Sequence, residues 1–487
     1  MKTKDNNFWW TKILLELIIL IELLNQSYGY HSSLPFFPFK KLQHPILQKS
    51  IEELQPTFQE IDLKTMSSLK KILDLYKKEH VSSFDFHGVN GYGHGDIGRE
   101  KFDSVISQLM GGEKALVRLQ FFSGTHAIST ALFGCLRPGD EFLSVSGQPY
   151  DTLEEVIGLR LNEQTEGLTG SLKDWGIHYH QLDLQIHPDF SNNDNNILDN
   201  SSPLVDFDYA KIKEKLDSNP KIKLIHVQRS CGYQWRPSIQ ISQLQKLVEF
   251  IRKEYSERKE LILFCDNCYG ELVEDQEPCH IGFDLVAGSL IKNLGGTLAP
   301  CGGYIVGKEK LVAASAVHLS APGVDGGATL QQYRHLFQGL FMAPSIIGES
   351  LKGSTLLSTV LGKYLSFPCN PPPIQMGSSY DRTDIIQAIR LGRRDRVLAF
   401  CEAVQRNSPI GSFIRPVPGM TAGYGDEVIF ADGTFIDGST LELSADGPLR
   451  EPFVVYSQGC VHWTHWALIL DDLLTNSPAF QQPEEDR

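Results

Sequence analysis

The stretch DLVAGSLIKNLGGTLAPCGGY, residues 284–304, places one lysine between an apolar run and a group of glycines. The apolar run ends at Ser289, and Lys292 follows it closely. A short apolar run bounded by turn residues is typical of a buried strand. Glycine lets the backbone behind the lysine turn tightly. We therefore expect a strand to deliver Lys292 to a site at its carboxyl end.

Two more predicted strands precede this one and end in polar residues. KIKLIHVQRS (221–230) ends in an arginine and a serine, and LILFCDN (261–267) ends in an aspartate and an asparagine. The segment between these two strands has apolar residues at helical spacing. We therefore expect strand, helix and strand to form a βαβ unit, which implies a parallel sheet. Ligands of open α/β sheets bind at the carboxyl ends of the strands. The strand ends can thus bring a lysine, a carboxylate and hydroxyls together.

A candidate phosphate site lies earlier in the chain. In FFSGTHAIS (121–129), Ser123, Gly124 and Thr125 precede a predicted helix. Exposed N–H groups at a helix start bind phosphate. Lysine, acid and phosphate site together indicate pyridoxal 5′-phosphate (PLP): the lysine forms a Schiff base and the acid pairs with the ring nitrogen.

These motifs resemble the PLP-dependent aluminium-resistance protein family, which is related to cystathionine β-lyase and methionine γ-lyase. The resemblance extends over about residues 50–475 and is carried by SGTHAISTALFGCLRPGDE, GQPYDTLEEVIG, QRSCGYQWRPS, DNCYGELVE, GSLIKNLGGTLAPCGGYIVG, RTDIIQAI and ELSADGPLREPFVVY. It implies an α/β, aspartate-aminotransferase-like PLP-dependent transferase fold. That fold has a large domain with a mostly parallel, seven-stranded-type sheet, a smaller C-terminal α+β domain, and an active site shared by a dimer.

The resemblance assigns roles to individual residues. It makes Lys292 the catalytic Schiff-base lysine and Asp266 the partner of the ring nitrogen. The phosphate contacts are assigned to the residues of the helix start and of the strand that precedes the lysine, namely Ser123, Gly124, Thr125 and Ser289.

The remaining site residues match the family pattern less closely or are chosen for their positive charge. Tyr150 is the candidate for stacking on the ring, and Arg229 the candidate for a cofactor or substrate contact. Tyr92 and Arg99 resemble a phosphate clamp given by a neighbouring subunit, although the related lyases use a closer Tyr-x-Arg pair. A substrate carboxylate needs a fork-like partner, for which Arg450 is the candidate, with Arg415 and Arg382 behind it. No metal is expected, because the CxxC at 265–268 lacks a second pair.

The length of 487 residues accommodates several regions. We expect a targeting segment or disordered arm at 1–50, a helical and glycine-rich arm at 51–110, the PLP-binding large domain at 111–343, the small domain at 344–475, and a tail at 476–487. We expect a surface loop at residues 188–204, and helices near 344–362, 382–407 and 461–474.

Charge and cysteine content limit the partners and the compartment. The formal net charge of −14, with no basic tract, argues against a nucleic-acid partner. Nine scattered cysteines favour free thiols in a reducing compartment. We expect an intracellular protein, cytoplasmic or organellar, with a plastid as one option.

The expected function is PLP-dependent lyase chemistry on a small amino acid, with β- or γ-elimination at a carbon–sulfur bond. The alternatives are transamination or racemisation with the same cofactor, or a PLP-binding protein with a regulatory or carrier role. A homodimer or homotetramer is expected from the resemblance.

Overall fold

The computed structural model describes residues 42–160, 170–186, 205–324, 326–327, 329–374 and 381–481. The chain divides into two units, 1–43 and 44–487, and the description below concerns the second. The loop expected at 188–204, most of the arm expected at 1–50 and the end of the tail lie outside the described residues. In the described part of the chain, no helix combines the length and apolarity that a membrane span requires.

A seven-stranded sheet forms the centre of the larger domain, in the order β1-β9-β8-β7-β6-β2-β3. Its strands are β1 (Lys114–Arg118), β2 (Glu141–Ser144), β3 (His178–Gln181), β6 (Ile222–Gln228), β7 (Ile262–Asp266), β8 (Leu285–Ser289) and β9 (Gly303–Gly307). Strand β9 runs antiparallel to both of its neighbours, and all other pairs are parallel. The expected seven-stranded, mostly parallel sheet is therefore confirmed.

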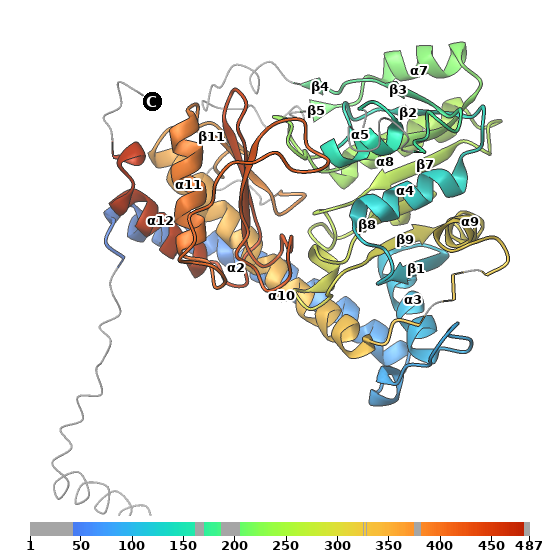
Figure 1. Cartoon of the computed structure of the whole chain (residues 1–487), viewed down its shortest axis with the longest axis horizontal. Coiled ribbons are helices and arrows are strands. Elements are labelled where there is room, and N and C mark those ends of the chain that lie inside the picture. The colour runs from blue at the N-terminus through green and yellow to red at the C-terminus, as the bar shows by residue number, and fades with distance from the viewer. Residues whose placement is uncertain are drawn as a thin grey trace, which may run out of the picture. The chain divides into compact units, whose positions relative to one another are not determined.

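Helices cover this sheet because its central strands are apolar on both faces. They are α4 (Gly124–Cys135), α5 (Asp151–Ile157), α7 (Tyr209–Ser218), α8 (Ile241–Glu254) and α9 (Glu309–Leu319). Helix α4 packs on β8, β9 and α9, as Figure 1 shows. Phe142 and Phe264 belong to the fully buried core cluster beneath α4. A two-stranded ribbon, β4 (Gln185–Ile186) with β5 (Val205–Asp206), lies apart from the main sheet.

The C-terminal domain is a five-stranded antiparallel sheet in the order β10-β11-β14-β13-β12. Its elements are β10 (Cys369–Asn370), β11 (Gln387–Arg390), α11 (Arg394–Arg406), β12 (Val428–Ala431), β13 (Ser444–Pro448), β14 (Val454–Gln458) and α12 (Thr464–Asn476). It has the α+β character expected. The helix expected at 382–407 was wrong in its first part, because that part forms β11 and pairs with β14.

Long helices join the parts of this unit. They are α2 (Pro45–Lys78), α3 (Ile97–Met110) and α10 (Tyr333–Leu357), with short helical turns η1 (Ser83–Phe86), η3 (Pro278–Ile281), η4 (Asn293–Gly295), η5 (Ser358–Tyr364) and η6 (Pro478–Phe480). Helix α10 packs along α2 and also contacts α3, η4, α12 and β14 (Figure 1). The boundary expected at 343/344 falls inside α10, and α2 begins within the segment expected at 1–50.

The loop after Lys292 approaches α10 very closely. A Cβ atom added to Gly296 would lie 1.9 Å from the carbonyl oxygen of Gly339, and one added to Gly339 would lie 2.2 Å from that of Gly295. Gly296 also has a φ of 54°, in the left-handed region that favours glycine. The turn behind the lysine is therefore fixed against a helix that continues toward the C-terminal domain.

Candidate active site

A cavity of about 270 Å³ opens where β7 and β8 end. It is lined by most of the residues singled out from the sequence, namely Ser123, Gly124, Thr125, Tyr150, Asp266, Ser289 and Lys292. Lys292 is the only basic side chain among its described lining residues. The cavity also receives residues of the C-terminal domain, so both domains build its walls.

Lys292 lies in the turn that follows β8, beside an aromatic ring. Its Nζ is 3.9 Å from the ring centroid of Tyr269. Burial acts to lower the pKa of Lys292, but Cys268, Tyr269 and Asp266 together outweigh it and the pKa is raised. Tyr269 has a φ of 73°, an unusual backbone conformation for a residue with a side chain. Such strain next to a reactive amine is characteristic of functional sites.

Asp266 is the last residue of β7 and is nearly buried, with 6% of its surface exposed. Its Oδ1 accepts a hydrogen bond of 3.1 Å from the backbone N–H of Cys268. In the sheet it pairs with Gln228 on one side and Ala287 on the other. This pairing brings the carboxylate and the end of the lysine-bearing strand to one edge of the sheet.

The start of α4 forms a cradle with the end of β8. Ser123 caps the helix, and its Oγ accepts a bond of 3.2 Å from the His126 N–H. A Cβ on Gly124 would lie 3.0 Å from the Cβ of Ser289, a tight contact that glycine avoids. The buried Ser289 Oγ has no hydrogen-bond partner among the described residues. A buried hydroxyl without a partner is costly, and a phosphate at the helix start would satisfy it.

Tyr150 lies at the start of α5 and connects the two domains. Its hydroxyl is 2.9 Å from that of Tyr424, and its backbone N–H donates to Gln228 Oε1 at 2.7 Å. Its ring meets that of Tyr233 edge-on, with centroids 5.5 Å apart. Because Tyr150 lines the cavity from this fixed position, it presents an aromatic surface there.

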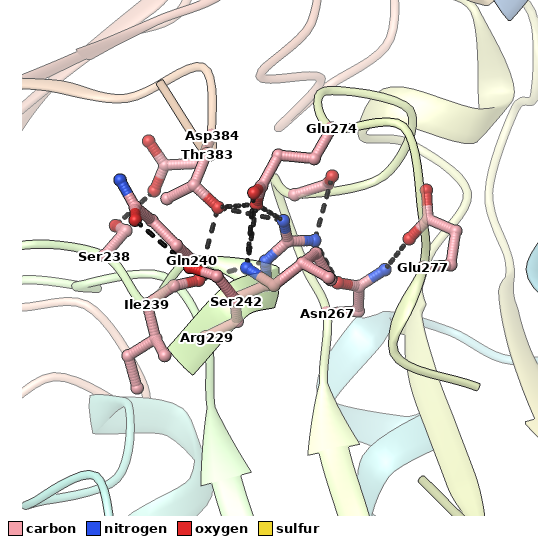
Figure 2. A network of polar contacts seen from close by, with 12 residues as sticks. Arg229, Ser238, Ile239, Gln240, Ser242, Asn267, Glu274, Glu277, Thr383 and Asp384 are labelled. Carbon is pink, nitrogen blue, oxygen red and sulfur yellow. Dashed lines mark hydrogen bonds and ion pairs between the residues drawn. The ribbon is translucent and has the colours of Figure 1, made fainter. Parts of the chain in front are cut away.

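Arg229 does not reach the cavity, contrary to the contact expected for it. Figure 2 shows its guanidinium inside a network of polar groups. Its N–H groups donate to carbonyl, amide, hydroxyl and carboxylate oxygens of Ile239, Asn267, Gly270, Glu274 and Thr383. These acceptors use all five donors of the side chain. Arg229 therefore ties the strand ends to the C-terminal domain and has no donor left for a ligand.

The two residues expected to serve a neighbouring subunit also lie outside the cavity lining. Tyr92 is 71% exposed. Arg99 is buried at the start of α3, beside Gly93 and Glu100.

The three arginines considered as partners of the substrate carboxylate all bind other groups of the chain. Arg450 Nη1 donates to Asp426 at 2.8 Å, and Arg450 is not among the cavity-lining residues. Arg415 is exposed and donates to Glu402. Arg382 is buried and donates to the carbonyl oxygens of Ile386 and Ser354.

Several lining residues were missed by the sequence interpretation. The C-terminal domain supplies Asp432, Asp446 and Tyr424, and the loop after β7 supplies Tyr269. Tyr269 lies within the DNCYG motif and could have been found from its place after the strand end. Asp446 lies in SADGPLREP, where only the arginine was considered.

The methionine gamma-lyase family model matches residues 43–477. The uncharacterised protein YnbB of Bacillus subtilis is 45% identical over 399 residues, which cover 81% of this chain and 87% of YnbB. These similarities confirm the suspected family.

Solved structures agree with this similarity. A carbon–sulfur lyase involved in aluminium resistance from Clostridium novyi is 37% identical with a TM-score of 0.77, covering 88% of this chain and 94% of that one. A Bacillus cereus protein is 40% identical with a TM-score of 0.77, covering 88% and 98%. The PLP-dependent protein YhfS of Escherichia coli is 15% identical with a TM-score of 0.53, covering 85% and 96%, and is similar in fold alone. The expected aminotransferase-like fold is thus confirmed.

Proposed function

The chain belongs to the methionine gamma-lyase family, and from that premise we propose that it is a PLP-dependent carbon–sulfur lyase acting on an amino acid. The observation that carries this proposal is the meeting of Lys292, Asp266, Ser289 and the start of α4 at one cavity. A lysine, an acid and a phosphate cradle are the three groups that PLP needs.

PLP supplies an electron sink that makes the α-proton of a bound amino acid acidic. The protein supplies the groups around it. Lys292 would hold the cofactor, and its Nζ would take the α-proton of the bound amino acid. Asp266 keeps the ring nitrogen protonated through its negative charge. Ser289 Oγ and the N–H groups at the start of α4 hold the phosphate.

Cleavage of a carbon–sulfur bond is the finer part of the proposal. It is supported by the Clostridium novyi structure, which is a carbon–sulfur lyase involved in aluminium resistance. The test is to incubate purified protein and PLP with cystathionine, methionine and cysteine, and to measure keto acid, ammonia and thiol. Keto acid with ammonia supports a lyase. Keto acid only with an added amino acceptor indicates transamination, and no product at all favours a non-catalytic PLP protein.

We also propose that the active unit is a homodimer or homotetramer. The phosphate of PLP carries up to two negative charges, yet Lys292 is the only basic side chain among the described lining residues. We propose that a second subunit supplies the missing cation, with Arg99 as the candidate for the charge and Tyr92 as a candidate hydroxyl donor to the same phosphate. Arg450 remains the candidate for the substrate carboxylate.

The proposed compartment is intracellular. All nine cysteines lie in described parts of the chain and are free thiols. This supports the reducing environment inferred from the sequence.

A further inference from the structure

The wall that the C-terminal domain contributes to the cavity is acidic and rich in hydroxyls. Asp446 lies on β13, where it pairs with Phe430 of β12, and Asp432 follows β12 directly. Both carboxylates line the cavity, together with Ser444 and Thr440. No arginine or lysine of the C-terminal domain is among the described lining residues.

Asp446 is held with one oxygen bound and the other available. Oδ2 accepts hydrogen bonds of 2.9 Å from the Tyr233 hydroxyl and 2.9 Å from Gln458 Nε2. Both donors are neutral, so they orient the carboxyl group without neutralising an ionised one. Burial raises the pKa of Asp446 to about 7, the nearby Asp432 adding to the effect. The side chain is 8% exposed and faces the cavity it lines.

Two hydroxyls of the same wall find no partner among the described residues. The buried Oγ of Ser444 and Oγ1 of Thr440 lack hydrogen bonds within the described parts of the chain. Buried polar groups in folded proteins are normally paired. Two hydroxyls and two carboxylates on one wall, with no cation from their own domain, form a set of acceptors that suits a cationic donor.

Resting on the proposed lyase function, we propose that Asp446, assisted by Asp432, selects substrates whose sulfur substituent ends in an ammonium group. An ammonium has three N–H donors and no acceptor, so it can satisfy the carboxylate and the hydroxyls at once. A purely alkyl substituent would leave these buried groups unpaired, and a site built for hydrogen bonding rejects such analogues. Asp446 would be a specificity-determining residue, while Lys292 carries out the chemistry.

The reaction on such a substrate balances without a further reactant beyond water. The α-proton moves to Lys292, and the carbon–sulfur bond breaks with its electron pair leaving on sulfur. The products are a thiol, pyruvate and ammonium, with one water consumed in the hydrolysis that releases ammonium.

The experiment compares two substrates of nearly equal size, S-(2-aminoethyl)-L-cysteine and S-propyl-L-cysteine. Thiol release by the PLP-loaded protein should show a kcat/KM roughly tenfold to a hundredfold higher for the aminoethyl compound, as expected for a charge-assisted hydrogen bond. In Asp446→Asn this preference should fall to about unity. Asp381→Asn is the matched control, because Asp381 is an exposed acid of the C-terminal domain and is not among the lining residues.

A second measurement separates this inference from the proposed function. Calorimetry with PLP-loaded Lys292→Ala reads the affinity for both amino acids without turnover. Tighter binding of the aminoethyl compound, lost when Asp446→Asn is added, supports the inference even if no thiol is ever released. Equal affinities, or a preference that survives Asp446→Asn, overturn it. Absence of thiol release from both substrates in the native protein counts against the lyase function alone.

Discussion

The two sides of the cavity differ in how their residues are brought there. The large domain contributes a floor of Asp266, Ser289, Lys292 and the start of α4, each at the end of a strand or the beginning of a helix. The C-terminal domain contributes a wall of Ser444 and Asp446, on the antiparallel strand β13, and Asp432, directly after β12. The floor contains the groups that PLP chemistry needs, and the wall contains groups that this chemistry does not require. We infer that the floor determines the reaction and the wall determines the substrate.

The largest effect is expected at the lysine of the floor. Lys292→Ala should lower kcat by about 10⁴-fold, because the amine that holds PLP and moves the proton is lost. Lys310→Ala, on the exposed start of α9, is the control and should leave kcat unchanged. Borohydride reduction and peptide mapping should place the pyridoxyl adduct on Lys292. An adduct on another lysine would show that the floor has been misassigned.

A smaller loss is expected at the acid of the floor. Asp266→Asn should still bind PLP, since the phosphate cradle is intact, but its kcat should fall roughly 10²- to 10³-fold because the ring loses its electrostatic partner. Cofactor content and single-turnover rates measure the two effects separately. A near-normal kcat would mean that Asp266 acts only in folding.

Apart from its effect on substrate preference, the wall should affect the stability of the fold. The pKa of Asp446 rises from its ordinary 3.8 to about 7 on burial near Asp432. A raised acid pKa means that folding stability is lost as pH rises from about 4 to 7, by about 4 kcal/mol in all.

Asp446→Asn removes this loss. We compare the unfolding free energy of the variant with that of the native protein at each pH. The difference between them, variant minus native, should be about 3 kcal/mol larger near pH 8 than near pH 5. Urea denaturation without PLP at both pH values measures it. A gain that does not depend on pH would show that Asp446 is ionised throughout.

The smallest expected effect tests whether the floor is complete within one chain. Lys292→Ala and Arg99→Ala proteins should each be nearly inactive. If Arg99 serves the neighbouring subunit, mixing them after subunit exchange should restore about a quarter of native activity, since half of the dimers then contain one native site. If no activity returns, Arg99 acts within its own chain, whereas an active Arg99→Ala homodimer would show that Arg99 has no role; neither result affects the role of Lys292.

The same contrast explains what the sequence could predict. The carboxyl ends of parallel strands lie at the same edge of a sheet. Recognising the strands from their apolar runs was therefore enough to predict that Asp266, Ser289 and Lys292 lie close together. Asp446 lies on an antiparallel strand, and its approach to Lys292 depends on how two domains pack, which local pattern does not encode. The beginning of the helix expected at 382–407 failed for the same reason, because β11 exists through its pairing with β14.

Arg229 shows the limit of the strand-end rule. It follows β6, the position that the rule gives to ligand-binding residues. Its guanidinium instead donates to the carboxylate of Glu274, from the loop after β7. The side chain of Asn267, which follows β7, accepts a hydrogen bond from Arg229 and donates one to Glu277 (Figure 2). A strand end supplies candidates, and only the three-dimensional neighbours determine which of them remain available.

The contact between the turn behind Lys292 and helix α10 has a consequence for how this family can diverge. Positions 295, 296 and 339 touch through backbone atoms at distances that admit no Cβ. A side chain at 296 or 339 would push the lysine-bearing turn away from the helix, and one at 295 would clash at 1.7 Å with the carbonyl oxygen of Leu290 inside the turn. These three sites should therefore remain glycine together in relatives that retain the reaction, whereas relatives that have lost it should be free to change all three.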